Sequence, residues 1–348
     1  MVMDRSASNR AWPGSRAWSG CPGALVISLD FELYWGMRDV VSLEAYRANL
    51  EGVHEVVPRI LDLFAAYDVH ATWACVGLVL AHDQEQARSW SPRLRPSYRQ
   101  RGLCPFEELD AGDLDRNARC YFAPRLVAEI QGRPHQELGT HTFSHYYCDE
   151  AGQSVEQFEA DLEAALLVAA EHDHRPQSLV FPRNQCNAAY LPVLRRRGIR
   201  AYRGRRRSWA YQAGHSRVTT MMRRGLRLAD NYAPVCPDGH TPASRSGLGA
   251  PVGGLVDIPG SRFLRPLSPS LRHLEPLRLR RMRLEMTRAA QCGHLYHLWW
   301  HPHNFGRDPK PNLRMLERLL EHARVLGDRL GFRSLTMAEA SRLYAHHD

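Results

Sequence analysis

Short apolar runs alternate with helical patterns along most of the chain. The first run, residues 24–32 (Ala-Leu-Val-Ile-Ser-Leu-Asp-Phe-Glu), is largely apolar until it reaches Asp30 and Glu32. A β-prone run without polar alternation is typical of a strand buried on both faces of a parallel sheet. Because side chains alternate along a strand, the two carboxylates are expected to point the same way. The alternative for this acidic pair is a helix N-terminus, where carboxylates are also favourable.

Six later segments have the same strand-like character, and they lie at residues 71–76, 137–140, 179–181, 199–202, 255–258 and 294–300. Helical spacing of apolar residues occupies several of the intervals. It covers residues 42–67, with an interruption at Pro58, and residues 312–330 form a long amphipathic pattern. Repeated β-α order predicts parallel strands joined by right-handed crossovers. The predicted fold class is therefore α/β, in one barrel.

Local signals mark where two helices begin and end. Ser154 and Gln157 form a capping box ahead of a helical pattern. A helix over residues 190–197 is expected to end at Gly198. Residues 81–120 interrupt the alternation with many Arg, Pro and Ser. We expect them to form a long insertion beside the mouth of the barrel.

The N-terminal segment is rich in Arg, Ser, Trp and Gly and lacks the apolar core of a secretory signal. We expect residues 1–22 to form a flexible tail in front of one domain over residues 23–348. No segment approaches the roughly 18 apolar residues of a membrane span. The eight cysteines are scattered without a C-x-x-C motif, which argues against a zinc ribbon and a disulfide scaffold. We therefore predict reduced thiols and a cytoplasmic location.

The charge of the chain is strongly basic. Its 46 Lys and Arg residues, nearly all Arg, outnumber 37 Asp and Glu residues and give a net charge of +9. Arginines concentrate at residues 195–197, 203–207 and 223–224. Such stretches can contact phosphates, either of a nucleic acid or of an anionic substrate such as a nucleotide- or lipid-linked sugar. No recognised nucleic-acid module accompanies the charge, so no nucleic-acid partner is expected.

Two histidines, His141 and His145, stand four residues apart directly after the strand at residues 137–140. If the backbone turns helical there, both imidazoles lie on one face and can bind one metal ion. The spacing alone is weak evidence, because the chain has 18 histidines. The acidic pair at the end of the first strand supplies an oxygen ligand. Together they predict a two-histidine, one-carboxylate site with open positions for water.

Two further strand ends carry unusual polar groups. Arg183, Asn184 and Gln185 follow the strand at residues 179–181, and His301 follows the strand at residues 294–300. The alternative for the first group is a turn with solvated side chains. The alternative for the histidine is an imidazole stacked on Trp or packed on the surface. In a barrel, however, residues just past the carboxyl ends of the strands are those that carry the chemistry.

These motifs, Asp30-Phe-Glu32, His141-Thr-Phe-Ser-His145, Phe-Pro-Arg183-Asn-Gln and Trp-Trp-His301-Pro, resemble in order and spacing the polysaccharide deacetylase family with the NodB homology domain, carbohydrate esterase family 4. The resemblance covers roughly residues 24–305. It implies a distorted (β/α)7 barrel with inserted loops. It also implies a hydrolase that removes N-acetyl groups from amino sugars with the help of a metal ion.

The resemblance also implies roles for individual residues. Asp30 corresponds to the general base, and Glu32 would bind the metal together with His141 and His145. The default metal for such ligands is Zn²⁺, with Co²⁺, Ni²⁺ or Fe²⁺ as alternatives. Arg183 would hold the base in place. His301 would be the general acid that protonates the leaving amine.

The sequence departs from the common family pattern in three places. Glutamate replaces a shorter acid at position 32, Asn187 stands where a proline is usual, and His303 follows His301 closely enough to be a rival acid. A further strand end carries Asp257, which could orient the acid histidine. The alternative for Asp257 is a turn or cap residue.

Several residues are candidates for contact with the substrate. Four aromatic residues near the strand ends could form an apolar wall for a sugar ring, although such residues more often belong to the core: Tyr34, Trp35, Trp299 and Trp300. Asn184, Gln185 and His303 are the polar candidates.

The predicted partner is an N-acetylated sugar, either a glycan or an activated precursor. An alternative within the same family is an amidohydrolase acting on a small non-sugar amide or ureide. A carbohydrate-binding protein without activity is a third alternative, but it would require a missing ligand or base, and neither is missing here.

Overall fold

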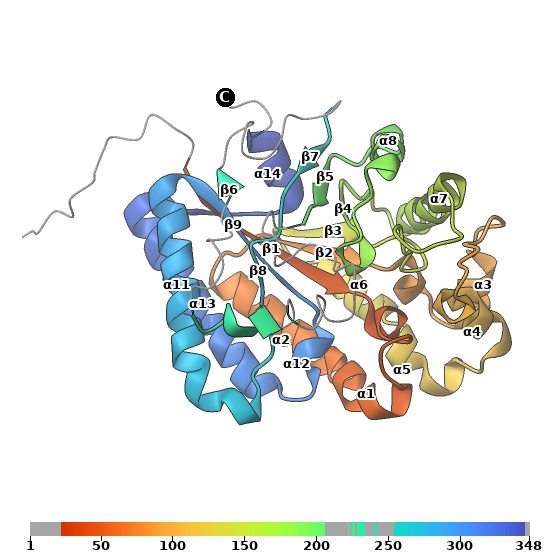
Figure 1. Cartoon of the computed structure of the whole chain (residues 1–348), viewed down its shortest axis with the longest axis horizontal. Coiled ribbons are helices and arrows are strands. Elements are labelled where there is room, and N and C mark those ends of the chain that lie inside the picture. The colour runs from red at the N-terminus through yellow and green to blue at the C-terminus, as the bar shows by residue number, and fades with distance from the viewer. Residues whose placement is uncertain are drawn as a thin grey trace, which may run out of the picture.

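The computed structural model describes residues 22–205, 222, 225–226, 228–233, 241–242 and 254–344 (Figure 1). The flexible tail expected over residues 1–22 lies outside the described residues except for residue 22. Most of the basic segment after residue 205 lies outside them as well.

A parallel sheet forms the centre of the molecule. Its strands are β1 Ala24–Phe31, β2 Ala71–Cys75, β3 Gln136–Thr140, β4 Ser178–Val180, β5 Ala201–Arg203, β6 Thr241–Pro242, β7 Val256–Asp257, β8 Arg262–Phe263, β9 His294–Trp300 and β10 Arg333–Leu335. They follow the order β6-β9-β1-β2-β3-β4-β5-β7, with β10 beside β1 and β8 beside β9. Only the pairing of the short β6 with β9 is antiparallel among the described strands.

One continuous segment closes the sheet into a barrel. The Ile258 N–H donates to the Tyr202 carbonyl at 2.9 Å, which joins the segment to the β5 edge. Three residues later the Ser261 N–H donates to the His297 carbonyl at 2.8 Å, which joins the same segment to β9. Strands β7 and β8 thus share one position in the barrel wall. The predicted distorted (β/α)7 barrel is confirmed.

Helices cover the outside of the barrel. They are α1 Leu43–Glu51, α2 Val53–Ala66, α3 Gln84–Ser89, α4 Pro105–Ala111, α5 Ala118–Tyr121, α6 Pro124–Gln131, α7 Val155–Glu171, α8 Leu191–Arg196, α11 Glu275–Cys292, α12 His303–Gly306, α13 Pro309–Leu330 and α14 Met337–Tyr344. Figure 1 shows α11 and α13 side by side on one flank, with α7 and α8 on the opposite flank. No helix in the described part of the chain is both long and apolar enough to cross a lipid bilayer.

The helix expected over residues 42–67 divides at Gly52, whereas Pro58 lies inside α2. A Cβ atom on Gly52 would come within 2.1 Å of the Gly306 carbonyl oxygen. Close packing against α12 therefore requires glycine at the break. The capping box is confirmed, because Ser154 accepts from the Gln157 N–H and Gln157 accepts from the Ser154 N–H.

All eight residues of β1 are buried, on two different faces. Leu25, Ile27, Leu29 and Phe31 join the large core beneath the helices. Ala24 and Val26 belong to a smaller cluster inside the barrel, together with residues of β9 and α14. Since alternate side chains share a face, Asp30 points into the barrel like Ala24 and Val26. The barrel interior thus changes from apolar to polar along β1.

Candidate active site

Polar side chains from several strands converge at the carboxyl ends of the barrel strands. Asp30 lies near the end of β1 and Glu32 directly after it, and Arg203 is the last residue of β5. His141 directly follows β3, and His301 directly follows β9. This edge is where barrel enzymes place their active sites.

Glu32, His141 and His145 form a compact buried group. Oxygen Oε2 of Glu32 lies 3.2 Å from Nε2 of His141 and 3.0 Å from Nε2 of His145. The three side chains are at most 3% exposed. Each therefore offers one ligand atom toward a common point.

The hydrogen bonding of His141 shows that this group fits a cation. Its Nδ1 lies 2.7 Å from the Val180 carbonyl oxygen, an acceptor that requires the proton to be on Nδ1 in the neutral ring. The Nε2 lone pair then faces a carboxylate oxygen, and Nε2 has no hydrogen-bond partner among the described residues. Two facing lone pairs repel each other, and a divalent cation between them removes the repulsion. Two imidazoles and a carboxylate are ligands suited to Zn²⁺ and similar metals.

The ionisation states agree with this assignment. Burial raises the pKa of Glu32, but the neighbouring imidazoles, His301 foremost, lower it well below its ordinary value. Burial lowers the pKa of His145. The group thus holds a carboxylate and a neutral imidazole, which are the forms that bind a metal.

The segment from His141 to His145, here called the histidine loop, is not helical, so a helical turn is not what brings the two imidazoles together. Thr142 and His145 have φ values of 66° and 60°. Buried Asp161 of α7 fixes this backbone, because it accepts from the Phe143 N–H at 2.8 Å and the Ser144 N–H at 3.3 Å, and also from the Ser144 hydroxyl. The role of Asp161 has no motif of its own in the sequence, where it is only one polar residue in an amphipathic helix.

Asp30 is held by Arg203. Nη1 and Nη2 of Arg203 each lie 2.6 Å from one of the two carboxylate oxygens. The guanidinium is buried and also donates to the Asn184 side-chain oxygen at 3.1 Å and to the Ser28 hydroxyl oxygen at 2.9 Å. Burial raises the pKa of Asp30, but nearby positive charges, that of Arg203 foremost, bring it below its ordinary value. Asp30 is therefore an ionised carboxylate with a fixed orientation.

Arg183, which was expected to hold Asp30, lies elsewhere. Its guanidinium forms an ion pair with Asp39 and stacks over the Tyr147 ring at 4.9 Å. Arg183 and Asn184 have φ values of 53° and 54°, and the turn directs Asn184, not Arg183, toward Arg203. Arg203 is the last residue of β5, so a search for polar groups at all strand ends would have found it.

His301 lies across from the metal group. Its Nε2 is 3.5 Å from Asp30 Oδ2 and 3.5 Å from Glu32 Oε1, and its side chain is 22% exposed. The Nδ1 of His301 lies 3.2 Å from the Asn304 side-chain oxygen. Asn304 thus orients this ring. The Asp257 carboxylate lies against Gly204, where a Cβ atom on the glycine would clash with it.

His303, the rival acid, is 1% exposed, and its ring stacks on that of His301. Burial lowers the pKa of His303 to about 3. A neutral, enclosed imidazole is less suited to deliver protons than the partly exposed His301.

Most of the expected substrate contacts are not at the mouth of the barrel. Trp35 and Trp300 are 0% exposed and Tyr34 is 6% exposed, so all three belong to the core. Trp299, on the opposite face of β9 from Trp300, stacks on Arg203 with 4.1 Å between Cζ and the ring centre. Gln185 ties two loops together through Asp149 and Glu150.

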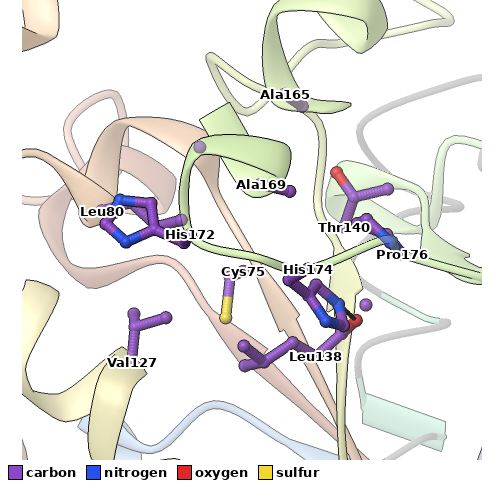
Figure 2. A pocket seen from close by; sticks show the side chains of 12 residues that line it. Cys75, Leu80, Val127, Leu138, Thr140, Ala165, Ala169, His172, His174 and Pro176 are labelled. Carbon is purple, nitrogen blue, oxygen red and sulfur yellow. Dashed lines mark hydrogen bonds between the residues drawn. The ribbon is translucent and has the colours of Figure 1, made fainter. Parts of the chain in front are cut away.

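A small cavity between strand β3 and helix α7 is separate from this site. Figure 2 shows Cys75, Leu138, Thr140, Ala165 and His174 among the residues that line it. Its volume of about 20 Å³ holds roughly one water molecule. It is too small for a sugar, and the metal group does not line it.

Comparison with known proteins agrees with the fold and the motifs. Residues 50–202 match the model of the polysaccharide deacetylase family. A structure from Mycobacterium smegmatis assigned as a polysaccharide deacetylase is 14% identical, with a TM-score of 0.54 over 97% of this chain and 93% of that chain. One from Pseudomonas aeruginosa PAO1, assigned likewise, is 12% identical, with a TM-score of 0.50 over 92% and 89%. At these identities the two likenesses concern the fold.

The barrel and its motifs define a deacetylase-type (β/α)7 protein. Over residues 50–202 the chain matches the polysaccharide deacetylase family, a family of hydrolases that act on carbon-nitrogen bonds of amides. Comparison with curated protein sequences gives no match.

Proposed function

We propose that the protein is a metal-dependent N-deacetylase that hydrolyses the N-acetyl amide of an amino sugar, in a glycan or a nucleotide- or lipid-linked precursor. The observation that carries the proposal is the position of the Glu32, His141 and His145 group beside the ion pair of Asp30 with Arg203. The group of Glu32, His141 and His145 is the set of metal ligands, Asp30 is the oriented carboxylate, and His301 is the partly exposed imidazole. They lie at or near hydrogen-bonding distance of one another.

Glu32, His141 and His145 would hold the metal ion, with Zn²⁺ as the expected metal and Co²⁺, Ni²⁺ or Fe²⁺ as alternatives. A divalent cation supplies Lewis acidity to the amide carbonyl and acidifies an adjacent water molecule. The protein contributes the geometry. Val180 fixes the tautomer of His141, and Asp161 fixes the backbone that carries both imidazoles.

Asp30 takes a proton from the attacking water as general base. Arg203 keeps this carboxylate ionised and holds both of its oxygens, so the base does not have to reorient during the reaction. His301 donates a proton to the leaving amine, which is too basic to depart as an anion. Its Nε2 lies 3.5 Å from Asp30 on the more exposed side of the site, and Asn304 orients the ring.

The proposed substrates all belong to the class of N-acetylated amino sugars. Trp299 is the aromatic residue best placed to contact a sugar ring, because it lies between Arg203 and His301. The six described cysteines are free thiols, in keeping with the predicted cytoplasmic location and a precursor sugar as substrate. The Arg-rich segment predicted to meet an anionic substrate lies largely outside the described residues.

The test is acetate release from a panel of N-acetylated sugars, nucleotide sugars and oligosaccharides, with and without a chelator. We expect turnover that disappears with the chelator and returns with Zn²⁺ or Co²⁺. Asp30→Asn should keep the metal and lose turnover, whereas His141→Ala should lose both. Hydrolysis of cyclic amides or ureides, without any of acetylated sugars, would favour the alternative amidohydrolase. Turnover that is indifferent to the chelator would contradict the proposal.

A further inference from the structure

The two oxygens of Glu32 face two different pairs of histidines. Oε2 faces His141 and His145. Oε1 lies 3.5 Å from Nε2 of His301 and 4.0 Å from Nε2 of His303. These last two rings are nearly parallel, at 10° and 5.0 Å between their centres. Their Nε2 atoms therefore approach the same carboxylate oxygen from one side.

His303 is difficult to explain as a core residue. Its side chain is 1% exposed, and neither ring nitrogen has a hydrogen-bond partner in the part of the chain that the structure describes. A buried polar group without a hydrogen-bond partner destabilises a folded protein. Tyr46 packs edge-on against the ring at 5.4 Å and leaves Nε2 directed at Glu32. The reaction proposed above gives His303 no task.

We propose that Glu32, His301 and His303 form a second site for a divalent cation, with Glu32 as a carboxylate bridge to the first. One ligand atom from each of the three residues lies within 4.8 Å of the others, and the same is true of Glu32, His141 and His145. Two imidazoles select Zn²⁺, Co²⁺ or Ni²⁺ over Mg²⁺ and Ca²⁺, which prefer oxygen ligands.

The second site is the weaker of the two. Both ions share the single negative charge of Glu32, so the second ion gains less from the carboxylate than the first. The positive charge of Arg203 lies beside Asp30, whose Oδ2 is 3.5 Å from Nε2 of His301. This charge disfavours a cation bound to that nitrogen. The first ion is bound on the other oxygen of Glu32, Oε2.

Occupation of the second site blocks the proton donor, a consequence that rests on the proposed function. The nitrogen that binds the second ion is Nε2 of His301, the atom assigned to protonate the leaving amine. An imidazole nitrogen that donates its lone pair to a cation carries no proton to give. Excess metal therefore inhibits the enzyme reversibly, whereas the first equivalent activates it.

The stoichiometry is tested by equilibrium dialysis of the chelator-treated full-length protein against Zn²⁺. We expect two ions per wild-type chain in two steps, and one ion in His303→Phe, which keeps the stacked ring but has no nitrogen. His145→Ala should weaken the tighter step instead. One ion per wild-type chain at every concentration would overturn the proposal, and so would two ions bound by His303→Phe with unchanged affinities.

A second measurement needs no variant. With Co²⁺ as the probe, two ions that share a carboxylate couple magnetically, so the electron paramagnetic resonance signal at two equivalents should be less than twice that at one equivalent. A doubled signal would overturn the bridging arrangement.

The inhibitory consequence is tested by comparing deacetylation at one and at many equivalents of Zn²⁺. At saturation of the second site the wild-type rate should fall by about 100-fold, the usual contribution of a general acid. The rate ratio should stay near one in His303→Phe. Two bound ions without inhibition would support the site and contradict the role of His301, so the two proposals fail separately.

Discussion

The ionisation and orientation of Asp30 depend on one buried guanidinium. Arg203 contacts both carboxylate oxygens, stacks on Trp299 and is itself held by Asn184. A planar guanidinium fixes a carboxylate through two parallel hydrogen bonds, which an ammonium group cannot do. Arg203 is therefore the residue whose geometry most directly controls the proposed base.

Arg203→Lys should lower kcat for acetate release by about 100-fold, because the charge remains but the base loses its fixed direction. The matched control is Arg183→Lys, whose guanidinium lies on Asp39 and Tyr147 and should leave kcat nearly unchanged. Urea unfolding of both variants separates a loss of fold from a loss of positioning. Equal losses of kcat in the two variants would contradict the assignment of Arg203.

His297 is a second buried group whose charge state is set by the fold. Its Nε2 lies 2.8 Å from the Ser28 hydroxyl oxygen and its Nδ1 3.1 Å from the Ile258 carbonyl oxygen. Burial lowers the pKa of His297 to about 3, and the charge of Arg203 acts in the same direction. The folded protein therefore keeps this imidazole neutral where the unfolded chain protonates it.

Below the unfolded pKa of about 6.5, the unfolded chain binds a proton that the folded protein excludes, so the free energy of unfolding falls as the pH decreases toward 3. From pH 7 to pH 5 this residue alone should remove about 2 kcal/mol. We expect His297→Gln to lose about that much of the pH dependence in urea titrations at the two pH values. An unchanged pH dependence would show that another group is responsible.

At the scale of elements, the proposed metal ligands depend on contacts between a loop and a helix. The histidine loop has left-handed backbone at Thr142 and His145, and Asp161 of α7 accepts two of its N–H groups. Helix α7 in turn starts from the Ser154 capping box. The spacing of the two histidines is therefore useful only because a separate element holds the loop in place.

Asp161→Ala should weaken the binding of the first metal ion by about 10- to 100-fold, the usual effect of removing a residue that supports metal ligands. Competition with a chromophoric chelator measures this affinity. The control is Glu163→Gln on the same helix, which removes an ion pair with Arg197 at 3.0 Å and should leave affinity unchanged. A normal affinity in Asp161→Ala would mean that the loop holds its shape without the carboxylate.

The sequence predicted the strands that carry the site better than it predicted the contacts between them. Residues 294–300 match β9 from end to end, because this run, rich in apolar and aromatic residues, is followed after one residue by Pro302. Strand β8 was missed, since two residues have no periodicity. That Arg203 and not Arg183 holds Asp30 could not be predicted either. It depends on the positive φ values of two turn residues, and neither is glycine.

At the scale of the whole molecule, the proposed metal group joins parts of the barrel that are distant in sequence. Glu32 follows β1, and the histidine loop follows β3, with β2 between them in the sheet. On the other side, β9 pairs with β1 and brings in His301 and His303. A cation bound by these residues therefore stabilises the arrangement of strands as well as the chemistry.

Removal of the metal should consequently lower the thermal stability of the whole barrel. A ligand at 100 times its dissociation constant stabilises the folded state by about 2.7 kcal/mol, which corresponds to roughly 4 °C in Tm for a protein of this size. Differential scanning calorimetry with and without chelator measures the shift. Glu32→Gln is the decisive control, because Glu32 belongs to both histidine groups. Its Tm should not respond to the chelator. A response as large as that of the wild type would place the stabilising ion away from Glu32 and remove the structural basis of both proposed metal sites.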